Sequence, residues 1–316
     1  FSTNQLANGI LQKDFDELLL SEEKPFFNRA LRGRYPPASS IKPAIAMYGI
    51  EEGLIDWNFS IFDEGFFTLP EDGRIYRDWK EGGHGDTNLF KAITQSSNTY
   101  FFDLAYRSDI NQLNKHLSSL GFGDKACIDC FEEDQVFVPE PSWKMNKHNF
   151  GWFKGDTVNM GVGQGYLVST PIQLAKYAYI MANKGKFSDL SLKKDLVKSE
   201  KSIEFNKFSN DDWFKLHESM VNVIEGNTGT ARRLRERKNY IVAAKTGTAE
   251  LVSGDNREQY SETRLDDSLR DHALIIAFGP MPNPRYAVSV VVENGESGGS
   301  VAGPVAISVL NSLIQE

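Results

Sequence analysis

The sequence predicts a mixed α/β (α+β) fold in which a C-terminal sheet is covered by helices. Two observations support this prediction. Runs of β-branched and apolar residues bounded by turn residues occur at 240–249, 273–278 and 287–292, as expected for strands. Apolar residues recur at helical spacing in several segments between 41 and 224 and again at 303–315, where an apolar face could cover the sheet.

Composition limits the classes of protein to which the chain can belong. Its 316 residues, 40% of them hydrophobic and 12% aromatic, are enough for one large domain or two lobes. The net charge of -8 and the lack of basic clusters argue against nucleic acid as a partner. We find no apolar run of about 18 residues that could span a membrane and no signal peptide. Because the chain opens on Phe1 without an initiator methionine, we expect a fragment of a longer protein.

The chain has only two cysteines, Cys127 and Cys130, in a Cys-x-x-Cys pattern. Such a pair can serve redox chemistry or form half of a metal site, but no second pair exists. The flanking apolar residues predict a strand, in which residues three apart lie roughly 10 Å apart. That separation is too long for a disulfide. We therefore expect neither redox nor metal chemistry here, and two cysteines do not fix the compartment.

The most informative stretch is 35–43, which places Ser39 three residues before Lys42. Prolines 36 and 37 favour an extended chain, and the apolar segment 41–50 predicts a buried helix with Pro43 in its first turn. Ser39 then lies at the helix N-terminus with Lys42 on the same face. A serine needs an adjacent base to become a nucleophile, and a buried lysine with a lowered pKa can be that base. The alternative is that Ser39 caps the helix and Lys42 is solvated.

A second polar group interrupts two apolar helices. The segments 88–94 and 99–105 are predicted helices, and Ser96-Ser97-Asn98 breaks them. Two hydroxyls and an amide in that position suit a proton relay and a contact to a substrate amide. The alternative is that these residues only cap helices. Further helices are predicted at 109–120, after Thr170-Pro171 and at 211–224.

The segment 55–88 lacks clear periodicity and is long enough to be a structured excursion that carries function. It contains Asp63, Asp78 and His84, which are residue types that bind zinc. A tetrahedral site would need a fourth ligand, which water, Asp86 or the Ser97 hydroxyl would have to approximate. The alternative is that these side chains cap turns in a glycine-rich loop.

The predicted strand 240–249 carries Lys245-Thr246-Gly247 and then Thr248. This strand edge presents the Lys245 ammonium, the Thr246 hydroxyl and the Gly247 backbone, which has no side chain. Such an edge can bind a peptide carboxylate by strand addition. The glycines at 161–165 lack the context of a phosphate-binding loop, so we predict a tight turn before the helix that Thr170 opens.

Ser39-x-x-Lys42, Ser96-x-Asn98 and Lys245-Thr246-Gly247 occur in the order found in penicillin-binding proteins and related β-lactamases, and the chain resembles that family. From about Pro25 to the C-terminus, it is similar to class B penicillin-binding proteins. The similar segments include 155–157, 163–165, 170–173, 229–231 and 271–273, and those at 77–80 and 83–85 most resemble penicillin-binding protein 2 of rod-shaped Gram-negative bacteria.

The resemblance implies a single transpeptidase domain, 1–316, with an antiparallel sheet covered by helices and an all-helical subdomain. Its α/β lobe would comprise about 1–38 and 230–316, and its mostly helical lobe about 39–229. The implied activity is that of a serine D,D-transpeptidase that cross-links peptidoglycan during cell elongation and is the target of β-lactam antibiotics. No cofactor is required for that activity.

The resemblance also assigns roles to residues. Ser39 would attack the D-Ala-D-Ala carbonyl, Lys42 would take its proton, and Ser96 would relay a proton to the leaving amine. The implied substrate-binding residues are Asn98, Lys245, Thr246, Gly247 and Thr248. Implied partners are peptidoglycan stem peptides and, through an absent N-terminal part, membrane proteins of the elongation machinery. The implied location is the periplasmic face of the bacterial inner membrane, with the anchor outside this fragment.

Three departures from the family pattern stand out. Ala38 and Ala244 occupy positions where glycine is usual. Relatives in the penicillin-binding protein 2 branch hold zinc with two Asp, a His and a Cys. Asp63, Asp78 and His84 match the first three, but Ser97 occupies the cysteine position, which leaves zinc binding open.

Two other classes of function remain. A class A β-lactamase would need Glu-x-x-Leu-Asn, and the closest match, 110–114, has isoleucine in place of the glutamate. A β-lactam sensor domain is a related alternative. A non-catalytic module that binds cell-wall peptide would not need Ser39 or Lys42.

Overall fold

The computed structural model describes residues 3–196, 199–251 and 269–314. Three strands near the C-terminus form an antiparallel sheet in the order β7-β8-β9: β7 (Ala243–Ala249), β8 (His272–Gly279) and β9 (Tyr286–Val292). All three predicted strands are confirmed, although β7 begins three residues later than expected. Alternation along β8 separates the two faces of the sheet, because Leu274, Ile276 and Phe278 face a different core from Ala273, Ile275 and Ala277.

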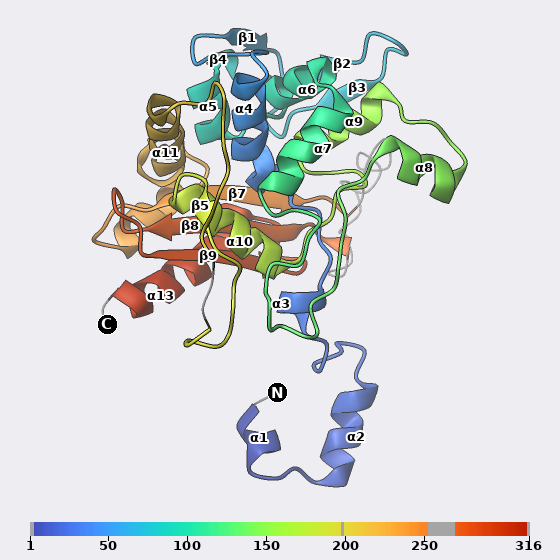
Figure 1. Cartoon of the computed structure of the whole chain (residues 1–316), viewed down its shortest axis with the longest axis vertical. Helices are drawn as coiled ribbons and strands as arrows, with labels where there is room; N and C mark the ends of the chain where they lie inside the picture. Colours follow the sequence, from blue (N-terminus) through green and yellow to red (C-terminus); the bar gives the residue numbers. More distant parts are fainter. Residues whose placement is uncertain (1–2, 197–198, 252–268, 315–316) are drawn as a thin grey trace.

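Helices cover both faces of this sheet (Figure 1). The C-terminal helix α13 (Gly303–Ile314) packs on one face, where Ala306, Ile307 and Leu310 are buried. The other face supports the larger core, to which most of the helices contribute. These helices are α4 (Lys42–Glu51), α5 (Leu89–Gln95), α6 (Asn98–Arg107), α7 (Ile110–Ser119), α9 (Lys154–Gly161), α10 (Pro171–Ala182) and α11 (Asn210–Glu225). The predicted α+β fold is confirmed. Since one core runs from α4 to the sheet, the two predicted lobes share it, and the boundary between them stays a prediction.

Shorter elements complete the chain. The excursion before α5 contains two small antiparallel sheets, β1 (Ser60–Asp63) with β4 (Gly85–Asn88) and β2 (Phe66–Thr68) with β3 (Ile75–Arg77). The remaining elements are α1 (Thr3–Ala7), α2 (Gln12–Leu20), α3 (Arg29–Arg32), η1 (Ala38–Ile41), α8 (Pro141–His148), β5 (Lys186–Phe187), β6 (Lys201–Ser202), η2 (Arg232–Arg237) and η4 (Gly298–Ala302). In Figure 1, α1 and α2 project away from the rest of the chain. Among the described residues, no helix combines the length and apolar character needed to cross a bilayer.

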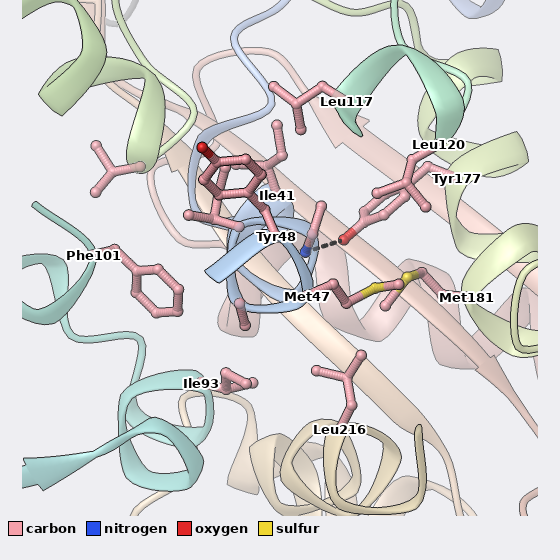
Figure 2. Packing of buried hydrophobic residues seen from close by; sticks show 14 of the residues in the cluster. Ile41, Met47, Tyr48, Ile93, Phe101, Leu117, Leu120, Tyr177, Met181 and Leu216 are labelled. Atoms are coloured by element: carbon pink, nitrogen blue, oxygen red, sulfur yellow. Dashed lines mark hydrogen bonds between the residues drawn. The ribbon is translucent and has the colours of Figure 1, made fainter. Parts of the chain in front are cut away.

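Helix α4 lies at the centre of the larger core, and every residue from Lys42 to Ile50 is buried. Its first turn is held from two sides. The Ala44 backbone N–H donates to the Tyr177 hydroxyl (3.0 Å), drawn as a dashed line in Figure 2. His116 Nε2 lies 3.0 Å from the Ala44 carbonyl oxygen. Because a helix leaves its first N–H groups without intrahelical partners, the Tyr177 contact satisfies a buried donor beside Lys42.

The predicted strand around the cysteines is wrong. Cys127 and Cys130 form a disulfide, with their Cα atoms 5.4 Å apart. The chain turns here because two carboxylates accept backbone N–H groups. Glu133 accepts from Ala126 and Cys127. Asp129 accepts from the backbone of residues 192 and 193, which ties the turn to a distant loop. Hydrogen bonds of this kind leave no periodic pattern in the sequence. The apolar residues that flank the cysteines were therefore the only local signal, and they predicted a strand.

Candidate active site

Ser39 lies in η1, the tight turn that leads into α4, and its side chain is half-buried. The preceding residue, Ala38, has a left-handed backbone with φ 49°, which explains why glycine would suit this position. The turn is held by a hydrogen bond from the Ala38 N–H to the Gly163 carbonyl (2.8 Å). The predicted tight turn at 161–165 is confirmed, and it supports the residue that precedes the candidate nucleophile.

Lys42 occupies the first turn of α4 and is completely buried. Its ammonium donates to the Ser96 carbonyl (2.8 Å), to Asn98 Oδ1 (2.7 Å) and to Ser96 Oγ (3.3 Å). Among the described residues, no protein hydrogen bond joins the Ser39 hydroxyl to Lys42. Contacts of this kind are often long in a ligand-free enzyme and tighten when substrate binds.

Ser96 ends α5 in a left-handed conformation, with φ 61°, and this turn presents its hydroxyl to two lysines. Lys245 Nζ donates to Ser96 Oγ (2.8 Å) and to the Thr246 carbonyl (3.0 Å). The indole N–H of Trp79 also donates to the Ser96 carbonyl (3.1 Å). Trp79 was not predicted to be a site residue, because a single aromatic residue in an aperiodic loop carries no signal of its own.

Burial decides the protonation of both lysines. It lowers the pKa of Lys42 to about 7, although the Asp78 and Asp63 carboxylates raise this pKa in part. Burial also lowers the pKa of Lys245 well below its ordinary value, and the charge on Lys42 lowers it further. Near neutral pH, a substantial fraction of Lys42 therefore carries a free lone pair.

Strand β7 forms the opposite wall of the site. A Cβ at Gly247 would lie 3.2 Å from the Pro37 carbonyl oxygen and 3.3 Å from the Ser40 nitrogen, so the strand passes close to the Ser39 turn. Thr246 Oγ1 lies 2.7 Å from Thr230 Oγ1. At the end of the strand, Gln164 Nε2 donates to the Thr248 carbonyl (3.2 Å). The structure thus brings the three sequence motifs together. Ala244, the second departure from glycine, is buried in the smaller core, to which α11 and α13 also contribute.

Asp63, Asp78 and His84 also come together, with one ligand atom of each within 4.8 Å of the others. His84 Nε2 lies 3.3 Å from Asp78 Oδ1, and its Nδ1 lies 3.0 Å from Gln95 Oε1. An amide oxygen on the second ring nitrogen is a common support for a histidine metal ligand. Asp78 Oδ2 also accepts the N–H of Asn98 (2.5 Å), which links this cluster to the Ser96-x-Asn98 motif.

Ser97 lies at the fourth corner of the cluster. Its hydroxyl donates to Asp63 Oδ2 (2.7 Å) and accepts the Tyr100 N–H (3.1 Å), where it caps α6. Asp86 is exposed and is not part of the cluster. Asp63, Asp78 and His84 therefore offer three ligand atoms that fit a divalent cation. The fourth position holds the neutral Ser97 hydroxyl, which already has two protein hydrogen-bond partners.

Comparisons with known proteins agree with this geometry. The model of the penicillin-binding protein transpeptidase domain matches residues 3–311. A peptidoglycan D,D-transpeptidase MrdA of Acinetobacter baumannii is 39% identical over 96% of this chain and 46% of its own length. The protein of the same name from Escherichia coli is 34% identical over 99% of this chain and 51% of its own length.

Solved structures give the same result. Penicillin-binding protein 2 of Pseudomonas aeruginosa, in complex with WCK 5153, matches with a TM-score of 0.87 and 36% identity over 98% of this chain and 67% of that one. Penicillin-binding protein 2 of Helicobacter pylori, in complex with MreC, matches with a TM-score of 0.83 and 30% identity over 96% of this chain and 55% of that one. The chain spans about half the length of the curated relatives that it matches. It belongs to the penicillin-binding protein transpeptidase domain family.

Proposed function

We propose that this chain is the catalytic domain of a peptidoglycan D,D-transpeptidase that forms an acyl-enzyme on Ser39. The observation that carries the proposal is the position of Lys42, buried one helical turn from Ser39 and hydrogen-bonded to Ser96 and Asn98. A lysine in that setting is suited to be a general base. Catalysis by these groups requires no cofactor.

The proposed first half-reaction uses these groups in turn. Ser39 Oγ attacks the carbonyl of the penultimate D-Ala, and its proton passes to Lys42. The backbone N–H groups of Ser39 and Thr248 stabilise the oxyanion. When the peptide bond breaks, Ser96, which lies between Lys42 and Lys245, relays a proton to the leaving amine.

Substrate binding and the second half-reaction use the opposite wall. Lys245 and Thr246 bind the terminal carboxylate beside the bare backbone of Gly247, and Asn98 holds a substrate amide. An amine from a neighbouring stem peptide then attacks the ester carbonyl and forms the new amide bond. The bond from the carbonyl to Ser39 Oγ breaks, and a proton from the amine passes through Lys42 to restore the Ser39 hydroxyl. A β-lactam would acylate the same hydroxyl.

Intact mass after incubation with a penicillin tests this proposal. We expect the mass of one penicillin to be added to the chain, with peptide mapping placing it on Ser39, and no addition to Ser39→Ala. Turnover of the penicillin within seconds would favour a β-lactamase instead. A wild-type chain without an adduct, or a labelled Ser39→Ala variant, would favour a non-catalytic binding module.

We also propose that the full-length protein works at the periplasmic face of the bacterial inner membrane with membrane proteins of the elongation machinery. Support comes from the Helicobacter pylori relative, whose structure was solved in complex with MreC. Cell fractionation and co-purification of the full-length protein test this assignment. Recovery in the soluble fraction without such partners would contradict it.

We propose further that Asp63, Asp78 and His84 hold a divalent cation such as zinc. The cation would neutralise two buried carboxylates and tie the excursion loop to the segment that begins α6. Since thiolate is a far better zinc ligand than a hydroxyl, Ser97→Cys should raise zinc affinity by at least about tenfold.

Metal analysis after dialysis, with a competing chelator to measure affinity, checks this prediction. Ser97→Ala is the matched control, because it removes the cap of α6 without adding a ligand. Equal zinc content in the wild type, Ser97→Cys and Asp63→Asn would show that these residues do not form a metal site.

A further inference from the structure

A cluster of arginines lines a surface cavity on the segment that follows Thr230, whose hydroxyl contacts Thr246 of β7. The cavity has a volume of about 350 Å³, and Asn227, Arg232, Arg233, Arg235 and Glu236 line it. All four charged side chains are on η2, and the intervening Leu234 is buried beneath them. That buried leucine anchors the short helix, so that the arginines face outward. The predicted lack of basic clusters is wrong here, because residues 232–238 carry four arginines and a lysine within a chain that is acidic as a whole.

Two of these arginines are free to bind a ligand. Arg235 is held by Glu225, with its Nε 3.7 Å from Glu225 Oε2, and Lys238 contacts the same carboxylate. Across residues 3–196, 199–251 and 269–314, neither Arg232 nor Arg233 forms a side-chain hydrogen bond or an ion pair, and both are exposed. Glu236 is the one acidic residue in the lining. Two guanidinium groups beside a cavity, in a chain of net charge -8, are suited to bind carboxylates.

The cavity is connected to the wall that would bind the substrate carboxylate. Thr230 precedes η2 by two residues, and its hydroxyl lies 2.7 Å from that of Thr246. Thr228 accepts a hydrogen bond from Gln95 (3.1 Å), at the end of the helix that Ser96 terminates. The loop at 227–231 therefore contacts Thr246 on β7 and the end of α5, and it continues directly into η2, which carries the arginines.

The proposed order of the reaction indicates which peptide would lie on the side of the site formed by Thr246 and Thr230. In the proposed mechanism, the leaving amine departs with the carboxylate that Lys245 and Thr246 bind. The attacking amine of the second half-reaction replaces the leaving amine, so by microscopic reversibility it enters on the same side. An acceptor peptide that enters past Thr246 would next meet Thr230, whose hydroxyl lies 2.7 Å away, and then η2.

We propose that Arg232 and Arg233 bind a carboxylate of the acceptor peptide and thereby select acidic acceptors. This inference rests on the proposed function. The arginines take no part in acylation, because the donor peptide and β-lactams react before the acceptor arrives. They act on the affinity for the acceptor and on its rate of association.

Acyl transfer from a thioester donor to two amine acceptors tests this role, one an acidic peptide and the other the same peptide with its carboxylates amidated. We expect Arg232→Gln combined with Arg233→Gln to raise KM for the acidic acceptor by about 5- to 20-fold, in line with the loss of two exposed charges. The amidated acceptor should show no change. High salt should weaken the preference of the wild type for the acidic acceptor.

Arg237→Gln is the matched control, because Arg237 is exposed on the same short helix but does not line the cavity. It should leave both acceptors unaffected. Equal effects of the double substitution on the two acceptors, or no effect on either, would overturn the proposal. Acylation by a penicillin, measured on the same samples, separates the two hypotheses. A wild type that is not acylated refutes the proposed function, whereas normal acylation without acceptor discrimination refutes only the role of the arginines.

Discussion

Lys42→Arg is expected to slow acylation of Ser39 by a penicillin by about 10²- to 10⁴-fold, the usual contribution of a general base. Arginine stays protonated at all accessible pH values, so it cannot take the serine proton. Lys42 is different because burial lowers its pKa to about 7. Stopped-flow measurement with a fluorescent penicillin gives the rate. Lys215→Arg, at a partly exposed lysine on α11 that pairs with Asp211, is the control and should react like the wild type.

The pH dependence of the same rate identifies the base. A lowered lysine pKa means that the neutral, reactive form increases as pH rises through about 7. The wild-type rate should therefore rise about tenfold for each pH unit below that value and level off above it. Lys42→Arg should lose this rising limb. A flat profile between pH 5 and pH 8 in the wild type, or a Lys42→Arg variant with a normal rate, would exclude Lys42 as the base.

Local chemistry explains which parts of the fold the sequence predicts well. The helix that starts at Pro171 was predicted because Thr170 caps it and proline suits its first position, and both signals lie within a few residues. The strands β8 and β9 follow from their apolar runs. The prediction of secondary structure failed where side chains distant in the sequence determine the course of the backbone. The turn that closes the Cys127–Cys130 disulfide depends on Glu133, whose carboxylate accepts two backbone N–H groups.

In the candidate site, too, residues in local motifs were predicted, whereas residues that depend on long-range contacts were not. The resemblance to penicillin-binding proteins predicts that Lys42, Ser96 and Lys245 share one site, and the structure joins them through hydrogen bonds to Ser96. Trp79 and Thr230 were missed as contributors to the site, because each reaches it through a single long-range contact. Such contacts depend on tertiary packing and leave no local pattern in the sequence.

Gly163→Ala is expected to reduce both stability and acylation. Gly163 has φ 73°, a backbone conformation that is unfavourable for alanine. Its added Cβ would lie 2.2 Å from the Ala38 carbonyl oxygen and 2.7 Å from the Ala38 nitrogen, so the backbone just before Ser39 would have to move. Left-handed strain and overpacking together should cost about 2–5 kcal/mol of unfolding free energy. Urea unfolding and the rate of penicillin acylation measure the two effects.

Gly165→Ala separates the two causes. Gly165 has the same φ of 73°, but a Cβ there would meet only the Asn159 side chain, at 3.1 Å. This variant should lose about 1–2 kcal/mol from strain alone and keep most of its acylation rate. If Gly163→Ala also acylates normally, the Gly163 turn does not position Ser39. A specific loss in Gly163→Ala would show that the nucleophile depends on a backbone contact from a turn more than 120 residues away, which explains why the Ser-x-x-Lys motif alone does not make a site.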